Sequence, residues 1–276
     1  MTADRIIVTD SITRLGDDPA GAVAIAASHG GEYCAHVALR ARLRGVVLHD
    51  AGIGKDAAGI GALAALAEHG IPAATVSGAS AWIGDGADVA AQGRVSHLNA
   101  PAAALGCSEG QLARACADRM LAARLPDAQP SDATEARTLA QHADDEGGPV
   151  WLCDSNALIR IEDEGAVVVT GSHGAALATA PRWAGAWLRG ALFNDAGAGP
   201  DGAGTSRLPM LDDFDIAAAT VDAFSARIGE AHSTYEDGVI SHLNTAAAAA
   251  GVRAGMTAKD AVALLRRRTP TAPATD

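Results

Sequence analysis

The chain contains the same series of short motifs twice. Four motifs of the N-terminal half return in the same order: Ser28-His29-Gly30 as Ser172-His173-Gly174, Asp50-Ala51-Gly52 as Asp195-Ala196-Gly197, Ile83-Gly84 as Ile228-Gly229, and Ser96-His97-Leu98-Asn99 as Ser241-His242-Leu243-Asn244. From the second motif onward, equivalent residues lie 145 positions apart. Duplicated copies are free to diverge, so shared positions indicate a shared role and differing positions indicate where the halves have separate roles.

The repeat divides the 276 residues into two parts that are each long enough to bury a core. We predict a first α/β repeat at 1–123, a linker at 124–148, a second repeat at 149–268 and a disordered tail at 269–276. The linker is polar and acidic and contains two prolines, and a short helix is expected within it at 135–142.

Composition excludes several classes of protein. A net charge of −12 without a large basic cluster argues against a nucleic-acid partner. No apolar run approaches the roughly 18 residues that span a bilayer, and the first residues do not resemble a signal peptide. The four cysteines have no C-x-x-C spacing and apolar neighbours, which is typical of reduced thiols in a cytoplasmic protein.

Short apolar runs alternate with helical patterns in both halves. The runs lie at 6–9, 22–26, 45–48 and 73–76, and again at 150–153, 166–170, 191–193 and 217–221. They are continuous rather than alternating, as expected for parallel strands covered by helices on both faces. The pattern predicts two tandem, pseudo-symmetric three-layer α/β/α repeats with mostly parallel sheets that pack against each other. One sheet continuous through both halves is the alternative.

Polar and glycine-rich motifs follow these runs directly, which places them at the carboxyl edge where α/β proteins bind ligands. At the first such turn, Ser28 is a candidate nucleophile or oxyanion contributor and His29 a candidate base. Gly30 and Gly31 would let backbone N–H groups approach a substrate. The alternative is structural, with Ser28 capping a helix and His29 bonding a neighbouring loop.

The second turn contains Lys55, one of only two lysines in the chain. We predict Lys55 as a substrate anchor or base and Asp50 as the carboxylate that orients the base. Gly52 and Gly54 would allow close approach of the backbone to a ligand, but the spacing is not that of a phosphate-binding Walker A loop. The second half has Pro200 where the first has Lys55, so we expect the first half to carry the chemistry.

Further candidates lie in the later motifs. His97 is a candidate base, although a core or interface role is equally open for this histidine. The predicted substrate-binding residues are Ser80, Trp82 and Asp85 of the first half and Ser172, His173, Asp195, Arg227 and His242 of the second. Neither the histidines nor the carboxylates show a helical ligand spacing, so no metal site is expected.

Two families resemble the chain in part. The order of apolar run, His-Gly and second apolar run is similar to that of caspase-like peptidases, but Asp50-Ala51-Gly52 stands where those enzymes have a nucleophilic cysteine. Cyclic-amide hydrolases are also built from repeated α/β units with serine and lysine at the centre. That resemblance is one of architecture and does not assign the family.

These observations predict an enzyme without a cofactor that acts on a small polar or anionic metabolite, with hydrolysis of an amide or cyclic-amide C–N bond as the leading reaction. A lyase or isomerase of a carboxylate or phosphate substrate, centred on Lys55, is the first alternative. A sensor that binds a small anion between two lobes is the second. We expect a homo-oligomer whose partner is a small-molecule substrate and not nucleic acid or a membrane.

Overall fold

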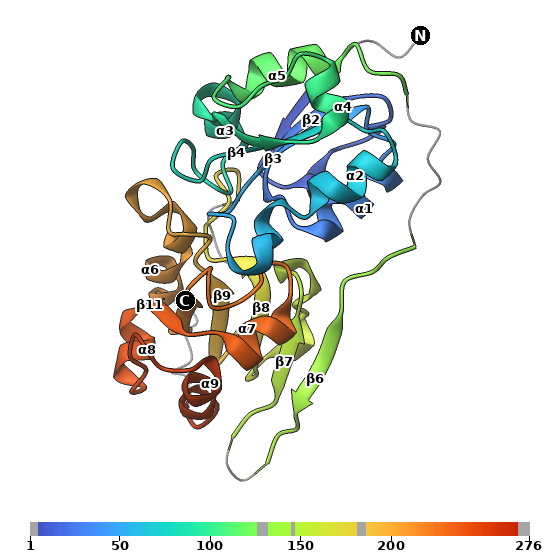
Figure 1. Ribbon diagram of the computed structural model, residues 1–276. Coiled ribbons are helices and arrows are strands. Elements are labelled where there is room, and N and C mark those ends of the chain that lie inside the picture. Colours follow the sequence, from blue (N-terminus) through green and yellow to red (C-terminus); the bar gives the residue numbers. More distant parts are fainter. Residues whose placement is uncertain (1–4, 126–131, 145–146, 181–185, 270–276) are drawn as a thin grey trace.

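The chain folds into two α/β units that stand one above the other (Figure 1). The computed structural model describes residues 5–125, 132–144, 147–180 and 186–269. A five-stranded sheet, in the order β1-β2-β3-β4-β5, forms the first unit, and a six-stranded sheet, in the order β11-β10-β9-β8-β7-β6, forms the second. The predicted fold class, two α/β repeats with mostly parallel sheets, is confirmed.

The strands agree closely with the apolar runs. Their bounds are β1 Ile6–Thr9, β2 Val23–His29, β3 Gly45–His49, β4 Ala73–Val76, β5 Val95–Leu98, β6 Arg137–Gln141, β7 Val150–Cys153, β8 Val167–His173, β9 Gly190–Asn194, β10 Ala217–Val221 and β11 Ile240–Leu243. The α-helices are α1 Glu32–Arg40, α2 Ala62–Glu68, α3 Gly86–Gln92, α4 Ala100–Ala104, α5 Ala113–Met120, α6 Arg207–Asp212, α7 Ala231–Asp237, α8 Thr245–Ala249 and α9 Ala258–Arg266. No helix in the described part of the chain has the length and apolar character needed to cross a membrane.

The last strand of each unit runs antiparallel to its neighbour. In the first unit β5 pairs with β4, and in the second β11 pairs with β10, with the same irregularity of register in both. The repeated Ser-His-Leu-Asn motif is therefore an edge strand followed by a helix cap. This position of the motif sets His97 and His242 at equivalent points of the two sheets.

One local expectation was wrong. The helix expected at 135–142 is strand β6, because it pairs with β7 and the Arg137 guanidinium stacks on the Trp151 ring at 3.6 Å. Between β3 and α2 the chain forms a short 3-10 helix at Lys55–Ile60, in which Asp56 and Ala57 have positive φ angles of 52° and 57°. Strand β2 continues from the apolar run through Ser28 and ends at His29, within the Ser-His-Gly motif. Residues 126–131 and 145–146 of the predicted linker and 270–276 of the predicted tail lie outside the described residues.

The carboxyl edges of the two sheets face each other, and small residues make the contact. Ala51, Ala58, Ile83, Ala175, Ala196 and Ile228 form one buried cluster drawn from both halves. At its centre Gly52 and Gly197 meet so closely that a Cβ added to either would lie 3.1 Å from the Cα of the other. The Lys55 N–H also donates to the Ala223 carbonyl across the contact, at 2.8 Å. The repeated glycines are thus needed for the packing of the two units.

Loss of Asn99 or Asn244 is expected to destabilise the fold strongly. The buried side-chain amide of each asparagine makes four hydrogen bonds. Asn99 Oδ1 accepts the N–H groups of Ala73 and Ala102, and its Nδ2 donates to the carbonyls of Leu63 and Ile71. Asn244 repeats the arrangement. We expect Asn99→Ala and Asn244→Ala each to cost about 3–5 kcal/mol in denaturant unfolding, because several buried groups lose their partners.

Thr257→Ala provides the control for these two variants. Thr257 caps α9 from an exposed position and accepts one hydrogen bond, from the Asp260 N–H. Its loss should cost about 1 kcal/mol, the usual effect of a helix cap. A loss of similar size in all three variants would contradict the proposed role of the two asparagines.

Candidate functional site between the two halves

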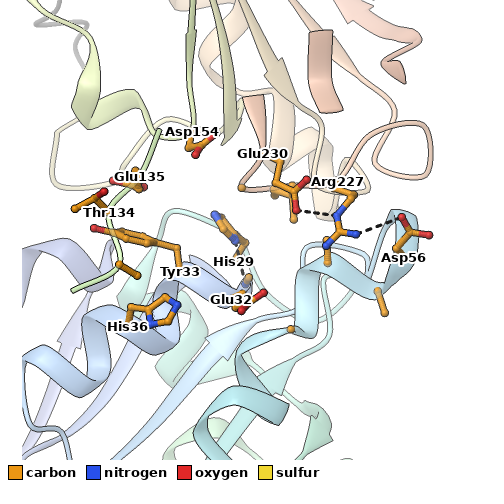
Figure 2. A pocket seen from close by; sticks show the side chains of 17 residues that line it. His29, Glu32, Tyr33, His36, Asp56, Thr134, Glu135, Asp154, Arg227 and Glu230 are labelled. Atoms are coloured by element: carbon orange, nitrogen blue, oxygen red, sulfur yellow. Dashed lines mark hydrogen bonds and ion pairs between the residues drawn. The ribbon is translucent and has the colours of Figure 1, made fainter. Parts of the chain in front are cut away.

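A cavity of about 270 Å³ lies where the two units meet. Its wall combines residues of both halves with the segment 132–136 that leads into β6, here called the joining segment. The titratable and aromatic side chains that line the cavity are His29, Glu32, Tyr33, His36, Asp56, Glu135, Asp154, Arg227 and Glu230 (Figure 2). Three separate parts of the chain therefore contribute titratable side chains to the cavity.

His29 projects into the middle of this space from the end of β2. Figure 2 shows its ring between Tyr33 and Glu135 on one side and Arg227 and Glu230 on the other. Its Nδ1 accepts a hydrogen bond from the Gly31 N–H at 3.0 Å, so the neutral ring carries its proton on Nε2. Burial, and then the proximity of His49, lower the pKa of His29 to about 4. At neutral pH His29 is therefore an uncharged N–H donor rather than a base.

Glu135 reaches the cavity from the joining segment. Burial raises the pKa of its carboxyl to about 7, and the nearby Asp154 carboxylate adds to this effect, whereas a hydrogen bond from Ser155 and the charge of Arg40 oppose it. The segment is held in place by Arg40, whose Nη1 donates to the Ala133 carbonyl at 2.7 Å. A carboxyl group that titrates near pH 7 can both take and return a proton under physiological conditions.

Asp154 stands beside Glu135 and is fixed by backbone groups. Its Oδ1 accepts the Ala231 N–H at 3.0 Å and its Oδ2 accepts the Ala136 N–H at 2.8 Å. These bonds connect α7 of the second unit to the joining segment. The carboxylate thus ties the cavity wall together and supplies the negative charge that raises the pKa of Glu135.

Among the described residues, the lining is acidic overall, because five carboxyl groups surround one arginine that is already paired. Arg227 Nε lies 2.8 Å from a Glu230 carboxylate oxygen, and its Nη1 lies 3.6 Å from Asp56. Glu32, Glu135 and Asp154 complete a set of five carboxyl groups. This charge distribution favours a neutral or cationic ligand over an anionic one.

The predicted site residues do not all meet in the cavity. His29, Gly31 and Arg227 line it. Gly31 is required there, because an added Cβ would lie 2.6 Å from the Nδ1 of His29. Gly30 lies beneath the turn, where a Cβ would come 2.5 Å from the Gly59 carbonyl oxygen. Gly52 and Gly54 belong to the contact between the units.

The other predicted catalytic residues have partners outside the cavity. Ser28 Oγ accepts the Ile12 N–H at 2.9 Å in the protein interior. Asp50 Oδ1 accepts the N–H groups of Gly52 and Gly78. Lys55 Nζ pairs with Asp237 at 2.9 Å across the contact between the units. His97 lies on the edge strand β5, away from the cavity lining.

The remaining predicted binding residues lie outside the cavity lining. In the first half, Ser80 bonds Ser77 and Arg94, Asp85 caps α3, and the backbone N–H of Trp82 donates to the Asp88 carboxylate. In the second half, Ser172 accepts the Asn156 N–H, and Asp195 accepts two backbone N–H groups. The exposed ring of His242 lies near Asp195. His173 is buried, and its Nδ1 accepts the Ala175 N–H at 3.3 Å. It occupies the same place in the second unit as His29 in the first.

One pair of equivalent residues shows how such turns are built. The Nδ1 of His49 accepts the Ala51 N–H and its Nε2 bonds the Ala81 carbonyl. At the equivalent place, Asn194 accepts the Ala196 N–H through Oδ1 and donates to the Ala226 carbonyl at 3.1 Å. Histidine and asparagine thus make the same two bonds, and His49 has a structural role.

Glu135, Asp154, Tyr33 and Glu230 were not among the predicted site residues. Asp154 carried a signal, since it follows a strand as Asp10 does in the first half. Glu135 carried none, because the joining segment has no counterpart in the repeat.

No protein-family model, curated protein or solved structure matches the chain. Among the residues that the structure describes, no group of three or more His, Cys, Asp or Glu side chains is arranged to hold a metal ion.

Ser28→Ala is expected to retain activity and lose stability. The variant leaves the buried Ile12 N–H without its acceptor, which costs about 1–3 kcal/mol. Ser172→Ala, which removes the equivalent bond to the Asn156 N–H, is the matched control and should cost a similar amount. Turnover and thermal unfolding of both variants would check this. A loss of turnover in Ser28→Ala alone would instead point to a nucleophilic serine.

Proposed function

We propose that the cavity between the two units hydrolyses the C–N bond of a small amide or cyclic amide by acid–base catalysis. The observation that carries this proposal is that two complementary groups line the same cavity. One is Glu135, whose pKa lies near 7, and the other is His29, a neutral N–H donor. Enzymes tune acid–base groups toward the working pH and place uncharged donors where negative charge develops.

The reaction follows from these two groups. The Glu135 carboxylate takes a proton from water while the water oxygen attacks the amide carbon. The carbonyl oxygen gains negative charge and accepts the hydrogen bond from His29 Nε2. Glu135 then returns its proton to the leaving nitrogen, and the C–N bond breaks to give a carboxylic acid and an amine. A neutral imidazole is suited to this role because it stabilises the oxyanion without giving up its proton.

The other functions suggested by the sequence draw less support from the contacts. A lyase or isomerase centred on Lys55 needs a free amine, but Lys55 is paired with Asp237 outside the cavity. A sensor of small anions needs a net positive lining, whereas the described residues of this lining include one arginine and five carboxyl groups. Amide hydrolysis requires neither.

The proposal is tested with His29→Asn, assayed against a panel of small amides and cyclic amides by release of amine or ammonia. Asparagine can accept the N–H two residues further along the chain, as Asn194 does at the place equivalent to His49, but its shorter side chain withdraws the donor from the cavity. We expect kcat/KM to fall about 100-fold or more, the usual effect of removing one oxyanion donor. His49→Asn is the matched control and should keep wild-type turnover. Equal activity in both variants would contradict the role of His29.

The pH profile provides a second check on the same reaction. Since Glu135 acts first as a base, kcat/KM should rise through a pKa near 7 in the wild-type protein. A profile that is flat between pH 6 and 8 would exclude Glu135 as the base.

A further inference from the structure

The second copy of the cavity is filled by the protein's own chain. This twin site is defined by Asp10, Gly84 and His173, the equivalents of Asp154, Gly229 and His29. The two aspartates are held alike, since Asp10 Oδ1 accepts the Gly86 N–H at 2.9 Å and Asp154 Oδ1 accepts the Ala231 N–H at 3.0 Å. The two sites therefore start from the same framework.

The segment 175–180 fills the twin site. In the first half the equivalent residues lead into and form the start of α1, but here the chain turns inward. The Ala178 N–H donates to the Gly84 carbonyl at 3.0 Å. The N–H and the hydroxyl of Thr179 both donate to Asp10 Oδ2, at 2.7 and 2.5 Å. The Ala176 carbonyl oxygen lies 2.8 Å from where a Cβ of Gly84 would be.

In the open site, the part of the chain that the structure describes does not supply these donors. Gly229 lines the cavity beside His29, and no group of the described chain donates a hydrogen bond to its carbonyl. Asp154 Oδ2 accepts the Ala136 N–H, but no hydroxyl among the described residues reaches it as Thr179 reaches Asp10. The Gly229 carbonyl and Asp154 Oδ2 can thus each accept a further hydrogen bond from a ligand, next to the neutral His29 donor. In the twin site the equivalent acceptors are occupied by Ala178 and Thr179.

We infer that the cavity takes a small peptide-type amide whose N–H donates to the Gly229 carbonyl and which presents a second donor, a hydroxyl or an ammonium group, to Asp154. This inference rests on the proposed function and names the substrate class for the same site. The segment that fills the twin site is the template for the ligand, since it meets the same framework with an amide N–H and a hydroxyl. The acidic lining agrees with a ligand that brings donors and no carboxylate.

Binding of N-acetyl-alanyl-threonine amide, the dipeptide of residues 178–179, tests the inference. Affinity is measured by titration of the intact protein, followed through the NMR signals of the His29 ring. Two matched ligands each remove one donor: the N-methylalanine analogue lacks the N–H for Gly229, and the alanyl-valine analogue lacks the hydroxyl for Asp154. We expect each to bind at least about 10-fold more weakly, the effect of losing one good hydrogen bond.

A pair of glycine variants locates the binding in the cavity. In Gly229→Ala the new methyl group lies 3.2 Å from His29 Cε1 and intrudes on the site. Gly255→Ala is the control, because its φ of +85° matches the +88° of Gly229 while nothing lies within 4 Å of its added Cβ. Both variants carry the same backbone strain, and only Gly229→Ala should abolish binding.

The outcomes separate the inference from the proposed function. The inference is supported if Gly229→Ala no longer binds the dipeptide amide and if both analogues bind the wild-type protein more weakly. If that result is obtained but no amine is released, the inference stands and the proposed hydrolase activity is contradicted. No binding of the dipeptide amide, equal binding of the analogues, or unchanged binding by Gly229→Ala overturns the inference. Hydrolysis of N-methylated and unmethylated amides with equal kcat/KM would keep the hydrolase and overturn the inference.

Discussion

Replacement of Glu135 by glutamine is expected to make the protein more stable above pH 7 and to abolish amide hydrolysis. Burial and the neighbouring Asp154 carboxylate raise the pKa of Glu135 to about 7 in the folded chain, well above its value in an unfolded chain. The folded protein therefore incurs a free-energy cost when Glu135 ionises. Glutamine keeps the size and polarity of the side chain and never ionises, so the cost disappears together with the base.

The sign of the pH dependence follows from the raised pKa. Below about pH 4.5 Glu135 is protonated in both the folded and the unfolded chain and contributes nothing. As the pH rises toward 7, the unfolded chain loses the proton first, so the wild-type protein loses stability. Above pH 7 the loss is complete. Since the carboxyl is only half-buried, we expect a gain of about 1–2 kcal/mol for Glu135→Gln at pH 8 and none at pH 4.

Denaturant unfolding at several pH values, together with the amide hydrolysis assay, checks both parts. Glu32→Gln is the matched control, because Glu32 lines the same cavity from an exposed position at the start of α1. That variant should change stability by less than about 0.5 kcal/mol at either pH, as surface substitutions usually do. If Glu135→Gln is destabilised at pH 8, or keeps wild-type turnover, the assignment of Glu135 as the base fails.

The repeat allowed the fold to be predicted because it recorded the packing of two similar units. Apolar runs gave the strands, and the motifs that follow them gave the turns at the carboxyl edges. What both halves retain is mainly this framework. Asp50 and Asp195 each tie two backbone N–H groups together. Asn99 and Asn244 each make the same four hydrogen bonds.

The candidate site was predicted less completely, because it depends on features that are not repeated. Glu135 has no equivalent, and its pKa is set by burial against a distant strand end that no local pattern predicts. Arg227 differs from its equivalent Trp82, and the structure places Arg227 in the cavity lining. Ser28 and Lys55 attracted attention as reactive residue types, but their partners Ile12 and Asp237 come from other parts of the fold.

Three buried histidines should make the protein sensitive to acid. Burial is the main cause that lowers the pKa values of His29, His49 and His173 below the ordinary value of 6.5. Each ring uses Nδ1 to accept a backbone N–H. These hydrogen bonds require neutral rings. The three histidines therefore bind protons more readily in the unfolded chain than in the folded chain.

The sign is opposite to that of Glu135. Above pH 6.5 the three rings are neutral in both states and impose no cost. As the pH falls below 6.5 the unfolded chain takes up protons that the folded chain excludes, so stability falls by up to about 1.4 kcal/mol per pH unit for each histidine. Glu135 and Asp195, whose pKa values are raised, oppose part of this loss. We expect acid unfolding to begin between pH 6 and pH 4.

His49→Asn isolates the contribution of one ring. Asn194 shows that asparagine makes both hydrogen bonds of this position, so the variant should fold with a stability at pH 7.5 within about 1 kcal/mol of wild type. As the pH falls below 6.5 its stability should fall less steeply, by up to about 1.4 kcal/mol per pH unit, because the unfolded chain no longer takes up a proton on this ring that the folded chain excludes. The exposed His69→Asn is the control and should follow the wild-type curve. Parallel curves for His49→Asn and wild type would show that His49 accepts its proton in the folded chain, where Asp50 and Asp88 are the carboxylates that favour the charged ring.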